Sequence, residues 1–120
     1  MHYPLTPDCT GGVCPVETTL NLISGKWKGI ILYRLLSGKK RFGELKKIIP
    51  AITFRTLTLQ LRQMEQDGIV ERTVYAEVPP RVEYALTDLG KSMKPIIQSM
   101  CDWGTNYQKR VDQTGNPASN

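Results

Sequence analysis

One stretch of the chain carries fork-shaped hydrogen-bonding side chains at helical spacing. Between Thr53 and Gln66, apolar residues recur three and four positions apart, at Leu57, Leu61 and Met64. The opposite side of this predicted helix carries Arg55, Thr56, Leu59, Arg62, Gln63 and Gln66. Arg and Gln present paired hydrogen-bonding groups that match the edges of guanine and adenine. The pattern favours a helix face that reads bases in duplex DNA, with an ordinary solvent-exposed face as the alternative.

The start of this helix suits phosphate. Thr53 is a plausible N-cap, and the hydroxyls of Thr53 and Thr56 lie where free backbone N–H groups can hold an anion. Leu59 is unusual on a polar face. It either contacts a thymine methyl group or is a harmless surface leucine.

A thiol offers a second kind of chemistry. Cys14 precedes Pro15, the expected first residue of a helix, and a helix N-terminus lowers the pKa of a thiol. Cys14 is therefore either a switch for oxidants or electrophiles or a small residue packed at a subunit interface. Cys9 is a candidate resolving partner, whereas Cys101, beside Met100, is expected to be packing.

Metal and enzyme chemistry have little support in the sequence. His2 is the single histidine, and its spacing from Cys9 and Cys14 matches no common zinc pattern. We find no phosphate-binding glycine loop, no nucleophile elbow and no base for a Cys14 thiol enzyme. No catalytic residue, metal or cofactor is expected.

Charge is unevenly distributed along the 120 residues, a length that suits one domain. The segment 26–62 holds ten basic residues and only Glu44 as an acid, a net charge of +9, whereas the rest carries −4. This asymmetry favours a polyanion partner over simply solvated lysines, and Lys39, Lys40 and Arg41 are expected near phosphate. The N-terminus has no signal sequence, no apolar run approaches about 18 residues, and three cysteines fit a reducing compartment. A cytoplasmic location without membrane contact is expected.

These residues need elements to position them. Periodicity and stop signals predict helices over about 15–23, 26–36, 42–49 and 53–66, with Ile30 and Leu35 among the residues facing inward in the second. Alternation predicts strands over 69–75 and 81–86, with prolines in the loop between them. A last helix is expected over 88–111, kinked or broken by Pro95.

The order of elements predicts a winged helix-turn-helix in an α+β, mostly helical fold. The fourth helix would lie in the major groove, and the two-stranded hairpin would form the wing. Arg81 on the wing is then expected to approach the minor groove or the adjacent backbone. We expect an arm over 1–13, one domain over 14–112 and a tail over 113–120.

Several motifs resemble the HxlR family of bacterial regulators, relatives of the MarR type. They run from Cys14-Pro15-Val16 and Gly25-Lys26-Trp27 through Arg41-Phe42-Gly43-Glu44-Leu45, Leu57-Thr58, Leu61, Met64-Glu65 and Asp67-Gly68 to Val78-Pro79-Pro80-Arg81-Val82-Glu83-Tyr84, Leu86-Thr87, Gly90 and Trp103-Gly104. The resemblance implies a winged-helix homodimer, joined by its terminal helices, on a two-fold related DNA site. Many members sense electrophiles or oxidants at the Cys14 position. The family more often has a polar residue at position 59, so the target sequence does not carry over.

The spacing of large apolar residues in the last helix also predicts a dimer. The interface residues expected are Leu20, Ile97, Met100, Trp103 and Tyr107. Two rivals remain: a non-enzymatic module that binds protein through the same helix, and a regulator that responds to a non-covalent small ligand. A salt titration separates DNA binding from protein binding, because phosphate contacts release counterions.

Overall fold

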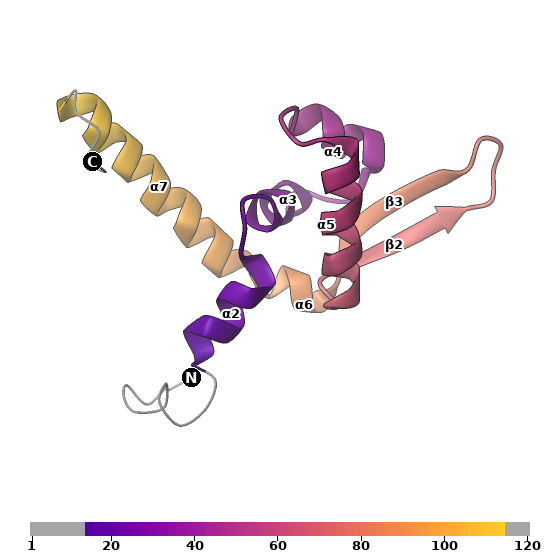
Figure 1. The fold of residues 1–120 in the computed structure, drawn as a ribbon, viewed down its shortest axis with the longest axis horizontal. Coiled ribbons are helices and arrows are strands. Elements are labelled where there is room, and N and C mark those ends of the chain that lie inside the picture. The colour runs from indigo at the N-terminus through magenta and orange to yellow at the C-terminus, as the bar shows by residue number, and fades with distance from the viewer. Residues whose placement is uncertain (1–13, 115–120) are drawn as a thin grey trace.

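The computed structural model describes residues 14–114, which form a mostly helical fold with a small antiparallel sheet (Figure 1). The elements are α2 (Pro15–Ile23), α3 (Lys28–Leu35), β1 (Lys40–Arg41), α4 (Phe42–Ile48), α5 (Phe54–Gln66), β2 (Val70–Tyr75), β3 (Arg81–Leu86), α6 (Asp88–Lys91) and α7 (Lys94–Thr114). The β2–β3 hairpin projects from one side of the molecule and α7 extends from the other (Figure 1). The α+β class predicted from the sequence is confirmed.

The first two helices show where periodicity defines a face and where it does not. Helix α2 begins and ends as predicted, and Gly25 follows it with φ +85°, a left-handed conformation that favours glycine. Helix α3 is shorter than predicted at both ends. The prediction that Ile30 faces inward is wrong, because Ile30 is exposed and Leu32 is fully buried beside Ile31. Apolar side chains occupy several sides of α3, so spacing alone does not select its inner face.

Helices α4 and α5 form the predicted helix-turn-helix pair. A short turn after Pro50 separates them, and Ile52 in that turn is buried with Leu45 of α4. Burial of this side chain fixes the turn against the core. On α5 the predicted apolar stripe of Leu57, Leu61 and Met64 is fully buried, which orients the rest of the helix outward.

The sheet has strand order β1-β3-β2 and is antiparallel throughout. The hairpin register runs from Val70 opposite Leu86 to Tyr75 opposite Arg81, which confirms the two predicted strands. Strand β1 was not predicted: it pairs Lys40 with Tyr84 and so adds a third strand at the base of the expected two-stranded wing. A strand of two residues is too short to show alternation in the sequence. Its pairing partner also lies over forty residues away, so no local turn signal marks it.

The predicted final helix is divided into α6 and α7. Thr87 caps α6 by accepting a hydrogen bond from the N–H of Gly90 at 3.1 Å. Pro95 is the second residue of α7, where its missing N–H breaks no helical bond. Helix α7 continues to Thr114, past the helix end predicted at 111 and the domain end predicted at 112. No helix between residues 14 and 114 has both the length and the apolar character that crossing a membrane requires.

Gly90 places α6 directly against the start of the wing. A Cβ atom added at Gly90 would collide with the carbonyl oxygen of Ile69 and lie 3.2 Å from a methyl group of Leu86. The N–H of Thr87 donates to the same Ile69 carbonyl at 3.0 Å. This close approach joins the base of the sheet to the segment that leads into α7.

Candidate nucleic-acid interface

Helix α5 is firmly capped and anchored. The Thr53 hydroxyl oxygen accepts a hydrogen bond from the N–H of Thr56 at 3.0 Å and lies 2.9 Å from the Thr56 hydroxyl. The prediction that Thr53 is the N-cap is therefore confirmed. Both hydroxyls already have local partners, so their first role is to begin the helix.

The outward face of α5 is accessible along its length. Arg55, Leu59 and Arg62 are exposed, whereas Gln63 and Thr56 are half-buried. Within residues 14–114, neither arginine forms an ion pair, so both guanidinium groups keep their donors for an external acceptor. Leu59 is 52% exposed and stands between them as expected.

Phe54 is an exposed residue that the sequence pattern did not single out. Its ring stacks on Phe42 of α4 with centroids 6.0 Å apart, and the Lys46 ammonium lies 5.3 Å from its centroid. This arrangement places a cation beside the start of α5. The exposed aromatic at the first helical position was a signal that could have identified it.

The wing arginine is held by carboxylates. Arg81 lies 3.4 Å from Glu77 and 3.5 Å from Glu83, and its guanidinium stacks 4.1 Å from the Tyr75 ring centroid. Glu83 is also 3.5 Å from the Lys39 ammonium. Two of the predicted phosphate-binding cations therefore share one largely buried carboxylate.

The two residues after Lys39 differ in their contacts. The Lys40 ammonium donates to the Ser37 hydroxyl at 3.1 Å and is half-buried. The backbone N–H of Arg41 donates to Glu44 at 2.7 Å. The Arg41 side chain takes no part in this bond and is exposed at the start of α4. Of the three predicted cations before α4, Arg41 is the one whose charged group has neither an ion pair nor a side-chain hydrogen bond in the described part of the chain.

A hollow of about 450 Å³ separates α5 from the wing. Arg62 and Glu65 line it from α5, and Arg72 lines it from β2. Arg72 was not among the predicted contacts. Its position opposite Tyr84 in the hairpin register brings it to this hollow, and sequence spacing alone does not reveal that register.

The two terminal helices present apolar side chains to solvent. On α2 these are Val16 and Leu20, and on α7 they are Met100 and Trp103, with Trp103 69% exposed. The Trp103 ring stacks on Tyr107 at 5.3 Å. Ile97, predicted with them, is instead 3% exposed and packs in the core of its own chain.

Cys14 lies at the N-cap of α2, as predicted, and its sulfur is in a disulfide. Cys101 is a free thiol of intermediate exposure on α7. His2 and Cys9, the other members of the zinc set considered above, lie outside the described residues. From Cys14 to Thr114, no cluster of three metal-ligating side chains is found.

Comparison with known proteins agrees with this arrangement. The model of the HxlR-like helix-turn-helix family matches residues 22–112. The HTH-type transcriptional regulator YdeP of Bacillus subtilis is 58% identical over 100 residues, which cover 83% of this chain and 78% of YdeP. The structure of the redox regulator HypR in its oxidized form matches with 57% identity and a TM-score of 0.75, covering 78% of this chain and 96% of that one.

A second solved structure extends the comparison to a more distant relative. The reduced form of the transcriptional regulator YodB from B. subtilis is 35% identical with a TM-score of 0.69, and the match covers 80% of this chain and 95% of YodB. The family match spans most of the chain and includes every element that carries the interface. The chain therefore belongs to the HxlR-like helix-turn-helix family of transcriptional regulators.

Proposed function

We propose that the protein binds a two-fold related operator as a homodimer, with one α5 helix in each of two successive major grooves. The observation that carries the proposal is the outward face of α5, where Arg55 and Arg62 are exposed and have no ion-pair partner in the described part of the chain. A guanidinium fork matches the two acceptors of guanine. The family relationship supports the same use of this helix.

In this proposal, some residues read the base sequence, and others bind the phosphate backbone and so position the protein on DNA. Arg55, Arg62 and Gln63 face base edges, and Leu59 lies at the height of a thymine methyl group. Thr53, Thr56 and Arg41 flank phosphate together with Lys46 near Phe54. Lys39 and Arg81 approach the backbone with part of their charge already balanced by Glu83. Lys40 is given no phosphate contact, because its half-buried ammonium is held at Ser37 within a pocket that both residues line.

The dimer forms through α2 and α7. Leu20, Met100 and Trp103 are exposed apolar side chains on these helices, and Tyr107 extends the aromatic surface through its stack with Trp103. Burying them against a second copy removes apolar surface from water, at about 25 cal/mol per Å². Two α5 helices must then lie about 34 Å apart to enter successive grooves on one face of DNA.

Control of the regulator is assigned to Cys14. It stands at the start of α2, a helix of the proposed dimer interface, and it takes part in a disulfide. Once a thiol reductant has cleaved this disulfide, an oxidant such as diamide removes two electrons and two protons from the two thiols. This restores the disulfide and leaves the reduced diamide hydrazine. An electrophile instead forms a bond with the thiolate sulfur. Either change alters packing around α2 and so the spacing of the two α5 helices.

A salt titration tests DNA binding against the rival that α5 binds another protein. The dissociation constant for a family of duplexes is measured by fluorescence anisotropy from 50 to 200 mM salt. Six to ten phosphate contacts predict a loss of affinity of about 10³–10⁵-fold over that range. An affinity that barely changes with salt would favour the protein-binding alternative.

The switch is tested by diamide on three proteins: wild type, Cys14→Ser and Cys101→Ser. Each protein is first reduced with dithiothreitol, which is then removed. Diamide is expected to release the wild type and Cys101→Ser from DNA, and Cys14→Ser is expected to stay bound. Release of Cys14→Ser like the wild type would move the sensor to another cysteine. A regulator that ignores diamide altogether fits the alternative of a non-covalent ligand.

A further inference from the structure

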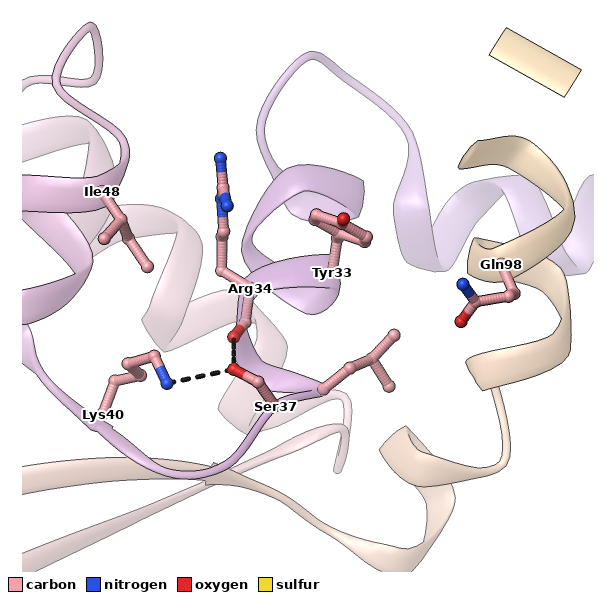
Figure 2. A pocket seen from close by; sticks show the side chains of 7 residues that line it. Tyr33, Arg34, Ser37, Lys40, Ile48 and Gln98 are labelled. Atoms are coloured by element: carbon pink, nitrogen blue, oxygen red, sulfur yellow. Dashed lines mark hydrogen bonds between the residues drawn. The ribbon is translucent and has the colours of Figure 1, made fainter. Parts of the chain in front are cut away.

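A pocket of about 440 Å³ lies where α3, β1, α4 and α7 meet (Figure 2). Its lining residues are Tyr33, Arg34, Leu36, Ser37, Lys40, Ile48 and Gln98. Two of them are cations and none is a carboxylate. The polar groups are dominated by donors, which is the chemistry that accepts an anion.

One end of the pocket holds an ordered ammonium group. The Ser37 hydroxyl donates to the backbone carbonyl of Arg34 at 3.1 Å and accepts from the Lys40 ammonium at 3.1 Å. Figure 2 shows these two bonds in series at one side of the hollow. The ammonium keeps two further N–H donors, so it is positioned but not satisfied.

The second cation stands beside an aromatic ring. The Arg34 guanidinium lies 5.5 Å from the Tyr33 ring centroid. Figure 2 shows it directed away from the Lys40–Ser37 pair, with Gln98 approaching from α7 on the other side of Tyr33. No carboxylate in residues 14–114 forms an ion pair with Arg34 or Lys40. Lys39 and Arg81 differ, because Glu83 balances both of them. The pocket therefore has one cation on each of two sides, and no carboxylate in the described part of the chain balances either of them.

We propose that this pocket binds a small organic anion through its carboxylate or phosphate group. Lys40 and Arg34 supply the charge partners, and Leu36 and Ile48 supply apolar walls for the body of the ligand. A volume of about 440 Å³ falls within the range of small-molecule sites, about 300–1,000 Å³.

The position of the pocket gives its occupant a regulatory effect, and this step rests on the proposed function. Ile48 belongs to α4, the first helix of the helix-turn-helix, and Gln98 belongs to α7, a helix of the proposed dimer interface. A ligand that contacts both elements stabilises one arrangement of the DNA-binding unit relative to α7. Its affinity then depends on whether operator is bound, and operator affinity depends equally on the ligand.

Binding is tested on the full-length protein without DNA. Inorganic pyrophosphate and citrate are titrated at constant ionic strength and followed by amide chemical shifts. We expect saturable shifts around residues 33–40, and affinity about tenfold or more weaker in R34A/K40A. The charge-matched variant K109A/R110A changes two exposed cations on α7 and is expected to bind like the wild type. Equal binding by wild type and R34A/K40A, or no saturable shift with either probe, would overturn the proposal.

Two further experiments test whether the variants remain folded and whether the bound anion is a small molecule or a DNA phosphate. The single variants Arg34→Gln and Lys40→Gln remove the charge but keep a polar side chain, and each is expected to bind the probes several-fold more weakly with an unchanged circular dichroism spectrum. Anisotropy with operator then tests the alternative source, a DNA phosphate. If the double variant lost DNA affinity and salt dependence while probe binding stayed intact, the two cations would be DNA contacts and the small-anion site would be rejected. Since the probe titration contains no DNA, its result does not depend on whether the protein binds an operator.

Discussion

Helices α5 and α7 both have an apolar side and a polar side, but they use them in opposite ways. On α5 the stripe of Leu57, Leu61 and Met64 is fully buried, and arginines face solvent. On α7, Ile97 is buried whereas Met100 and Trp103 are exposed. The apolar side of α5 is covered by its own chain, and its polar side is the surface proposed to bind a polyanion. Helix α7 has apolar surface that residues 14–114 do not cover, which is typical of an interface.

The largest effect should follow from damage to the buried side of α5. Leu61→Ala is expected to lower the free energy of unfolding by about 2–5 kcal/mol, because it leaves a cavity in the core. Leu59→Ala on the exposed side is the control and should stay within about 0.5 kcal/mol of wild type. Urea denaturation at one fixed protein concentration measures both. Equal losses would mean that α5 is not oriented as described.

The exposed side of α7 should matter to assembly. Trp103→Ala is expected to weaken dimerisation by about 2–4 kcal/mol, the range of a central aromatic in an interface. Asp102→Ala, the neighbouring exposed residue, should leave the dimerisation constant unchanged. Sedimentation equilibrium measures this constant. A wild-type protein that is monomeric at micromolar concentration would remove the proposed role of α7.

The polar side of α5 is tested through DNA affinity. Arg55→Ala is expected to cost about 1–3 kcal/mol on the preferred duplex and to reduce discrimination between sequences. Arg110→Ala removes the same charge from α7 and should leave the discrimination between sequences unchanged. Unchanged operator binding by Arg55→Ala in anisotropy titrations would show that the recognition face is assigned wrongly.

The smallest effect concerns the start of α5. Thr53→Ala removes the acceptor for the Thr56 N–H and is expected to lower the free energy of unfolding by about 1 kcal/mol. Thr53→Ser keeps the hydroxyl and should restore most of this loss. Thermal denaturation of the three proteins checks the order, and a Ser variant as unstable as the Ala variant would argue against capping.

Local signals in the sequence were sufficient for α5 and for the break before α7. Thr53 and the apolar stripe define the start and inner face of α5, and Pro95 predicts the interruption near α6. These features depend on backbone chemistry within a few residues. Helix α3 was harder, because Ile30 and Leu32 have the same chemistry and only the packing partners decide which is buried.

Features that depend on distant pairing were not predictable in the same way. Strand β1 exists because Lys40 pairs with Tyr84, and the wing arginine Arg81 is held by Glu77 and Glu83. Sequence spacing identifies such side chains as cations but not as partners of a carboxylate. The sequence therefore predicted the exposure of side chains best on α5, where it follows from helix periodicity. It predicted least about the contacts of Lys39, Lys40 and Arg81.

The close contact at Gly90 lies at the start of the long helix α7, so a small change of angle there would be large at the far end of that helix. Helix α7 has 21 residues, so it is about 31 Å long at 1.5 Å per residue. A rotation of roughly 5° at its α6 end would move its far end by about 3 Å. The side chain that is missing at Gly90 lets α6 rest on the backbone of Ile69, and any larger residue would push the pivot outward. The hydrogen atom that Gly90 carries in place of a side chain thus allows this close contact at the start of α7. In the proposed dimer, the same contact would help to define the distance between the two α5 helices.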